Sequence, residues 1–216
     1  ATEVYPTGIL SVVSDTWDFW QVITKYLVIL KPEIMARPGK YVSRPDSGDP
    51  VKIICGDKAA AAESPEANGT IQCLWNTFSG TYNAKDFKEL DSHVGAIYGD
   101  SITLLMADQI TRGLEAKGFA SSNIVLGVGS YTYEYVTRDT HGMAIKSTAI
   151  VMGGKWIPIF KDPVTDKDNF KKSATGLIKV VKGPDGLPML VQNCDITDDF
   201  SDDLLEVVFE DGILKR

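Results

Sequence analysis

The sequence has few of the residues that build disulfide frameworks or metal sites. Its three cysteines, Cys55, Cys73 and Cys194, are far apart and odd in number, and no C-x-x-C pair occurs. This pattern argues against a zinc site or a disulfide framework and favours a reducing, cytoplasmic location. The two histidines, His93 and His141, have no Asp, Cys or Ser partner at a useful spacing. We therefore interpret both as structural rather than catalytic.

Long apolar runs and an excess of basic residues are also absent. No apolar run approaches the length of a membrane span, and residues 1–6 lack the basic and apolar regions of a signal peptide. The first residue is Ala1 rather than Met, so we expect an internal start. The formal net charge of -7 argues against bulk nucleic-acid binding, which needs a basic surface. It leaves room for one local phosphate pocket, because a few Arg and Lys side chains suffice for that.

The composition is that of a globular protein. The chain has 216 residues, of which 44% are hydrophobic and 24% are charged. Four short apolar runs each end in polar residues, and helix-like segments alternate with them, which predicts parallel βα units. The runs cover residues 9–13, 40–43, 93–98 and 123–126.

Helix signals follow three of these runs. Apolar residues at helical spacing over 17–27 predict a helix after the first strand. Asp49 can cap a second helix with Pro50 in its first turn. Ser101 can cap a third helix over residues 102–117.

Two regions depart from the βα alternation. Residues 57–69 are rich in Ala, Glu, Pro and Gly, which predicts a surface insertion. The pattern changes again after about residue 142. We therefore expect an α/β region over residues 1–142 and an antiparallel β region over residues 143–216.

The second region carries two hairpin signals. Glycine turns at residues 153–154 and 183–186 each separate two apolar runs, which predicts two β-hairpins. Residues 204–209 have the pattern of a short amphipathic helix.

Polar residues at the strand ends are the candidates for chemistry, because ligands bind outside the carboxyl ends of parallel strands. Carboxylates gathered at one rim repel one another unless a cation or a polyhydroxyl ligand such as ribose lies among them. The four ends supply Ser11 and Asp15, Arg44 and Asp46, Gly99 and Asp100, and Gly129 and Ser130.

The fourth strand end also has the features of a phosphate-binding turn. Residues 127–130 allow a close backbone approach, and their N–H groups face a following helix start. Arg138, Lys146 and Lys161 could neutralise a phosphate that the negative chain would otherwise repel.

Each of these residues has a plainer interpretation. Asp15 and Asp100, taken singly, are more often helix caps than ligands. Lysines on β segments are usually solvated, and the Trp17/Trp20 pair is most simply a helix packing face. The convergence of four strand ends favours a binding site more than any single residue does.

Five short segments, together with the turn at residues 127–130 that lies between the third and the fourth, occur in an order that resembles the nicotinamide phosphoribosyltransferase family. The resemblance covers nearly the whole chain but matches only the C-terminal part, about the latter half, of that family's members. It implies the second half of an irregular (β/α) barrel with parallel strands, followed by an antiparallel β domain built from both chain ends. The segments are residues 11–15, 44–48, 98–100, 137–139 and 160–164.

The resemblance also implies an activity. The family transfers ribose 5-phosphate from phosphoribosyl pyrophosphate to nicotinamide, giving nicotinamide mononucleotide and pyrophosphate in NAD salvage. It works as a homodimer with sites at the subunit interface. Mg²⁺ accompanies the pyrophosphate, without a dedicated protein site that we can identify here.

Residue roles follow from the same resemblance. Asp46, Arg44 and Asp15 are the implied catalytic residues, because carboxylates stabilise positive charge on the ribose and cations neutralise the leaving pyrophosphate. Ser130 stands where the family usually has Gly, which a backbone N–H donor tolerates. The implied substrate-binding residues are Arg44, Asp46, Gly99, Asp100, Gly129, Ser130, Arg138, Lys146 and Ser11.

Some of the family's machinery is missing from this sequence. The catalytic His, the stacking aromatic residue and the Asp that selects amide over acid lie upstream in the family. Four βα units are half a barrel, which would expose sheet edges and an unfilled interior. We therefore expect a fragment, a proteolysed remnant or one half of a split enzyme, inactive alone. Two alternatives stay open: a nicotinate phosphoribosyltransferase, and a non-catalytic module that binds a nucleotide or a partner chain.

Overall fold

The chain forms two compact units. The computed structural model describes residues 3–134, 136, 138–141, 144–166 and 171–215. The first unit comprises Ala1–Met143 and Asp162–Lys171, and the second comprises Ala144–Lys161 and Lys172–Arg216. The segment 162–171 thus returns to the first unit after the chain has entered the second.

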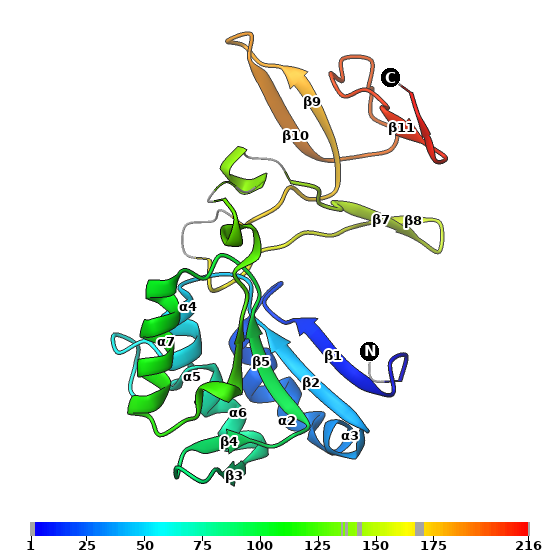
Figure 1. Cartoon of the computed structure of the whole chain (residues 1–216). Helices are drawn as coiled ribbons and strands as arrows, with labels where there is room; N and C mark the ends of the chain where they lie inside the picture. Colours follow the sequence, from blue (N-terminus) through cyan, green and yellow to red (C-terminus); the bar gives the residue numbers. More distant parts are fainter. Residues whose placement is uncertain (1–2, 135, 137, 142–143, 167–170, 216) are drawn as a thin grey trace. The chain divides into compact units, whose positions relative to one another are not determined.

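A four-stranded parallel sheet organises the first unit (Figure 1). Its strand order is β1-β2-β5-β6, and every neighbouring pair is parallel. This confirms the parallel βα reading, whereas no closed barrel is present in the described part of the chain. The strands are β1 Gly8–Val13, β2 Gly39–Arg44, β5 Val94–Tyr98 and β6 Ile124–Leu126.

Helices connect these strands, and most of them are short. The helical segments are α1 Phe19–Gln21, the π-helical η1 Val22–Tyr26, α2 Leu27–Ile29, α3 Lys31–Ala36, α4 Pro50–Cys55, α5 Pro65–Asn68, α6 Thr70–Phe78 and α7 Leu104–Ala116. Three 3₁₀ turns follow α7: η2 Ser121–Asn123, η3 Gly129–Thr132 and η4 Arg138–His141. Among the described residues, no helix is both long and apolar enough to cross a bilayer.

Capping confirms one prediction and corrects another. Asp49 caps α4 by accepting hydrogen bonds from the Val51 and Lys52 N–H groups, as the sequence predicts. The cap of α7 is Thr103 rather than Ser101, because the Thr103 side chain accepts from the Met106 N–H. Ser101 instead adopts a φ of 60°, in the left-handed region, so it cannot begin the helix.

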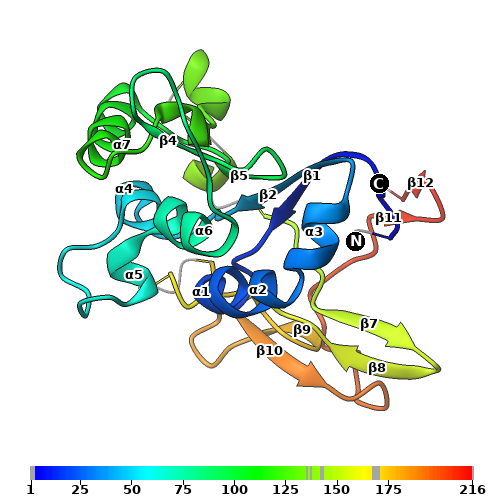
Figure 2. The same ribbon diagram turned by 90° about the horizontal axis from the view of Figure 1, so that it is seen from below.

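The core lies on one face of the sheet. In Figure 2, helices α1, α2 and α6 lie together on one side of β1 and β2. Leu10 and Val12 of β1 pack against this core, whereas the alternating residues Ile9 and Val13 are 78% and 46% exposed. The packing face predicted from Trp17 and Trp20 is confirmed only for Trp20, because Trp20 is buried but Trp17 is exposed.

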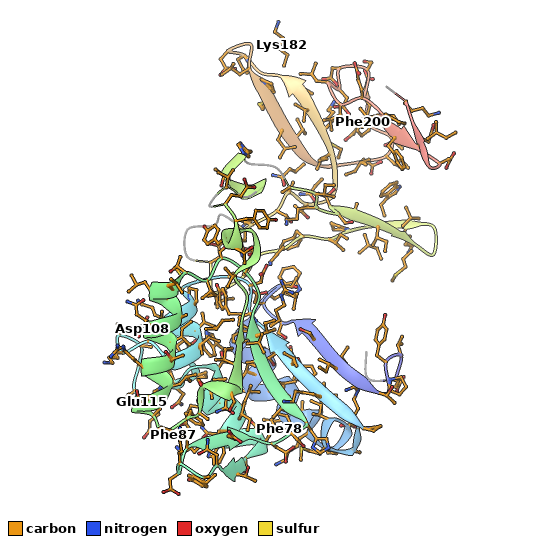
Figure 3. The ribbon with its side chains drawn as sticks, viewed as in Figure 1. Phe78, Phe87, Asp108, Glu115, Lys182 and Phe200 are labelled. Atoms are coloured by element: carbon orange, nitrogen blue, oxygen red, sulfur yellow. The ribbon has the colours of Figure 1, made fainter. Side chains whose placement is uncertain are left out.

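A small hairpin in the first unit was not predicted from the sequence. Strands β3 Gly80–Tyr82 and β4 Lys88–Leu90 pair antiparallel. The buried Asn123 fixes β4, since its Oδ1 accepts from the Leu90 N–H at 2.7 Å and its Nδ2 donates to the Lys88 carbonyl at 2.8 Å. A polar pocket of about 560 Å³ lies between this hairpin and α7, where Figure 3 labels three of its lining residues: Phe87, Asp108 and Glu115.

His93 has an acidic partner that was not predicted from the sequence. Its Nδ1 lies 2.7 Å from Oδ1 of Asp91, two residues earlier. The pair lies at the amino end of β5, so it belongs to the start of the strand and not to the strand ends where the candidate site residues lie.

The second unit is built from antiparallel pairs. Two predicted hairpins are confirmed, and a third pair begins at Phe209, the last residue of the predicted helix. The pairs are β7 Ala149–Met152 with β8 Lys155–Pro158, β9 Leu177–Lys182 with β10 Pro188–Cys194, and β11 Phe209–Glu210 with β12 Ile213–Leu214.

The helix predicted over residues 204–209 is therefore wrong. Asp211 and Gly212 have φ values of 50° and 79°, which makes the two-residue turn of a hairpin. Residues 204–208 have no regular structure, and Phe209 begins β11.

Candidate functional site

The carboxyl ends of β1, β2 and β5 bring a cation and a carboxylate together. Arg44, the last residue of β2, places Nη2 at 3.9 Å from Oδ1 of Asp46. Lys171, from the returning segment 162–171, places Nζ at 3.6 Å from the other oxygen, Oδ2, of Asp46. Both side chains of the Arg44–Asp46 pair are about one-third exposed, at 36% and 32%. One carboxylate thus lies between two cations that remain open to a ligand.

The Arg44 guanidinium rests directly on Gly99. A Cβ at position 99 would lie 2.5 Å from Arg44 Cζ, which is closer than side chains tolerate. Arg44 Nε is buried and has no hydrogen-bond partner among the described residues. Buried donors of this kind are normally satisfied, so an unused one at a strand end is consistent with a ligand position.

Asp15 is the buried member of this cluster. Its side chain is fully buried, and its Oδ2 accepts from the Asp46 N–H at 2.9 Å and from the Ser47 hydroxyl. The Ser47 Oγ lies 2.6 Å from Thr165 Oγ1. Asp15 is therefore not a helix cap, because Asp18 caps α1.

Tyr98 contacts the loop that follows Arg44 and Asp46. Its hydroxyl donates to the Gly48 carbonyl at 2.8 Å. Burial, followed by three nearby carboxylates, raises the pKa of Tyr98 well above its ordinary value. Those carboxylates belong to Asp46, Asp15 and Asp49. The site is thus acidic as well as cationic, and Tyr98 stays a neutral hydrogen-bond donor.

Asp100 lies against the turn after β6. Its Oδ1 accepts from the Ser101 N–H at 2.8 Å, so it does not cap α7 and the capping alternative is wrong. A Cβ on Gly129 would collide with this carboxylate. The Gly127 N–H donates to the Tyr98 carbonyl at 2.7 Å, which joins the turn to the end of β5.

Of the four remaining predicted site residues, the structure places only Ser11 relative to this cluster. Ser11 lies inside β1, opposite Val42, and is exposed on the sheet face that the core leaves uncovered. Lys146 belongs to the second unit and is exposed. The side chains of Ser130 and Arg138 lie outside the described residues, although their backbones form part of η3 and η4. Their phosphate-binding roles stay predictions.

Four residues of the cluster were not identified from the sequence: Ser47, Tyr98, Thr165 and Lys171. Ser47 and Tyr98 stand inside segments that carry the resemblance, so a search for hydroxyls next to the strand ends could have found them. Thr165 and Lys171 had no local signal, because they approach from far along the chain.

A pocket of about 590 Å³ opens beside this cluster, next to α4. The pocket is lined by Gly48, Thr165 and Lys171. Lys52 and Asp57 also line it, and Lys52 Nζ lies 3.2 Å from Asp57 Oδ2. Within the described ranges, no group of three or more His, Cys, Asp or Glu side chains is placed to hold a metal ion. The space suits a polar ligand of small-molecule size.

Comparisons with known proteins identify the family of this chain. The model described as "Nicotinate phosphoribosyltransferase (NAPRTase) family" matches residues 6–213. A nicotinamide phosphoribosyltransferase of Acinetobacter baylyi is 50% identical over 98% of this chain and 43% of the relative. Proteins with the same description from Mycoplasma pneumoniae and Xanthomonas campestris are 41% and 32% identical, over 76% and 98% of this chain. The chain spans 36% and 42% of those two relatives, which is less than half of each.

Proposed function

This chain belongs to the nicotinate phosphoribosyltransferase family, and we propose that it is the C-terminal part of an enzyme that transfers ribose 5-phosphate from phosphoribosyl pyrophosphate to nicotinamide. The observation that carries this proposal is the Asp46 carboxylate held between Arg44 and Lys171 at the end of β2. The relatives are described as nicotinamide phosphoribosyltransferases, which favours nicotinamide over nicotinate as the acceptor.

The two charges of the cluster suit the two ends of the donor. Carboxylates accept hydrogen bonds from vicinal ribose hydroxyls, so Asp46, helped by Asp100, would hold the ribose. The transition state develops positive charge on the ribose ring, which nearby carboxylates stabilise. Arg44 and Lys171 would take the pyrophosphate oxygens, with Arg44 able to bind two at once.

The phosphate on the ribose needs a separate cradle. The backbone N–H groups at Gly129 and Ser130 would serve it, with Arg138 and Lys146 as further cations. Mg²⁺ would be held mainly by pyrophosphate oxygens, because no group of three or more His, Cys, Asp or Glu side chains among the described residues is placed to hold the ion. The ion would neutralise charge on the leaving pyrophosphate, and the residues named above would position the donor without it.

The missing length of chain also has a structural role in this proposal. Strands β1 and β6 are the edges of the sheet, and Ile9, Val13 and Val125 are exposed on its uncovered face. An upstream half that supplies further parallel strands would close this sheet into a barrel and cover that face. The complete enzyme would be a cytoplasmic homodimer with its sites at the subunit interface.

An activity assay tests the proposal directly. The 216-residue chain should form no nicotinamide mononucleotide alone, and it should gain turnover when joined to its upstream part. An Asp46→Ala change should weaken nicotinamide mononucleotide binding in a calorimetric titration, with the exposed Asp108→Ala as the matched control. Turnover by the isolated chain would contradict the half-enzyme assignment. No turnover with the upstream part present would contradict the reaction itself. Competition between nicotinamide and nicotinate then identifies the acceptor.

A further inference from the structure

We propose that Asp15 is a positioning residue that fixes the Arg44–Asp46 loop through its acceptor oxygen, rather than a catalytic carboxylate that touches the ribose. This inference rests on the proposed function, because it assigns a role within the same site. Asp15 is fully buried, whereas Asp46 keeps about a third of its side chain exposed. A ligand therefore reaches Asp46 directly and reaches Asp15 only through the loop.

A single oxygen of Asp15 holds the loop at two points. Oδ2 accepts from the Asp46 backbone N–H at 2.9 Å and from the hydroxyl of Ser47. These two bonds orient the backbone on both sides of the Asp46 Cα. They fix where the Asp46 carboxylate points, and so they set its place beside Arg44.

The same contact extends to the returning segment. A serine hydroxyl has one hydrogen, and Ser47 donates it to Asp15, so the 2.6 Å contact requires Thr165 to donate to Ser47. The chain of bonds therefore runs from Thr165 through Ser47 to Asp15. It connects segment 162–171, which carries Lys171, to the loop that carries Asp46.

Backbone bonds hold the start of this segment in the same place. The Val164 N–H donates to the Trp17 carbonyl at 2.8 Å, and the Asp162 N–H donates to the Thr16 carbonyl at 3.2 Å. Both acceptors lie just after Asp15 in the sequence. Asp15 and the two residues after it thus hold two segments, the loop that carries Asp46 and the segment 162–171 that carries Lys171.

The chemistry separates the two possible roles of Asp15. A positioning role needs an acceptor oxygen, which the amide of asparagine also supplies. A catalytic role in stabilising the positively charged ribose needs the negative charge, which asparagine lacks. Asp15→Asn should therefore keep most of the activity if Asp15 positions the loop, and Asp15→Ala should lose it in either case.

The experiment measures kcat and KM in the complete protein, with its upstream part, for Asp15→Asn, Asp15→Ala, Ser47→Ala and Thr165→Val. We expect Asp15→Ala to reduce kcat/KM for phosphoribosyl pyrophosphate by about 10- to 100-fold, and Asp15→Asn by less than about 5-fold. Ser47→Ala should add little in the Asp15→Ala background, because both remove the same contact. Asp18→Asn is the matched control, since it makes the same exchange at a nearby helix cap.

Each result then supports or overturns the inference. Equal losses for Asp15→Asn and Asp15→Ala would assign Asp15 a charge role and overturn it. Additive losses for Asp15→Ala and Ser47→Ala would do the same, as would a lower melting temperature for Asp15→Ala with unchanged kcat and KM. If the unmodified protein has no transferase activity, the proposed function fails. Coupled melting temperatures across Asp15, Ser47 and Thr165 would then still support the bonded chain, and independent ones would overturn it.

Discussion

The contact between Gly99 and Arg44 allows the binding role of Arg44 to be separated from the stability of the fold. A Gly99→Ala substitution places a Cβ 2.5 Å from Arg44 Cζ. Ordinary carbon contacts need about 3.5 to 4 Å, so the guanidinium must move by roughly 1 Å or more. Because it is the far end of a flexible side chain, it can move without unfolding the protein. The backbone of Gly99 has no left-handed φ that would add strain.

The expected cost falls on the ligand. A charge-assisted hydrogen bond contributes about 1.5 to 3 kcal/mol, so a displaced Arg44 should weaken phosphoribosyl pyrophosphate binding by about 10- to 100-fold. The melting temperature should change little. The assay is a calorimetric titration with a thermal melt of each variant, in the protein that carries its upstream part. Gly95→Ala on the same strand is the control, because a Cβ there meets Lys40 Cδ at 3.4 Å, an ordinary contact.

A double-mutant cycle makes this reasoning refutable. Gly99→Ala acts through Arg44, so it should have almost no further effect in an Arg44→Ala background. If Gly99→Ala weakens binding equally with and without Arg44, the glycine acts by another route and the contact argument is wrong. Unchanged binding in Gly99→Ala alone would show that Arg44 does not reach the ligand from this position.

Two further predictions concern stability. Burial raises the pKa of Cys55 and Cys73 from 9.0 to about 11, so both thiols resist ionisation in the folded protein. The stability that the neutral thiols provide should therefore be fully present below pH 9. The free energy of unfolding should fall as the pH rises through about 11, by roughly 3 kcal/mol per thiol. Urea melts of the protein and of Cys55→Ala should differ in the slope of this free energy against pH, and equal slopes would count against the prediction. Asn123→Ala should lower the free energy of unfolding by about 3 kcal/mol, because three hydrogen bonds of the buried Asn123 side chain are lost. The exposed Ser121→Ala is the control in the same denaturation assay, and a loss below about 1 kcal/mol would be the contrary result.

The parallel sheet could be predicted because its strands have local signals. Each strand combines β-branched residues with an abrupt polar end, and the hairpin at Gly153-Gly154 has a turn signal that few other structures use. The β3–β4 hairpin could not be predicted, because each of its strands has three residues, too few to show an alternation of apolar and polar side chains. The helix predicted over 204–209 failed because an amphipathic pattern over six residues is compatible with several structures.

The candidate site could be predicted only in part, for a different reason. Arg44, Asp46, Gly99 and Asp100 stand at strand ends, and parallel strands bring those ends to one edge. Burial and long-range approach are not local properties. The sequence could not show that Asp15 is enclosed, nor that Thr165 and Lys171 would arrive from a segment more than a hundred residues away.

The glycines at the strand ends explain how charged groups from separate strands can occupy one small region. A Cβ on Gly99 would meet the Arg44 guanidinium, a Cβ on Gly127 would meet the Gly99 carbonyl, and a Cβ on Gly129 would meet the Asp100 carboxylate. Each glycine therefore makes room for a group that belongs to the neighbouring strand end. The contacts form a series from β6 through β5 to β2, so a side chain at Gly127 would displace Gly99 and, through it, Arg44. The position of the cation at the end of β2 is thus fixed in part by a turn two strands away.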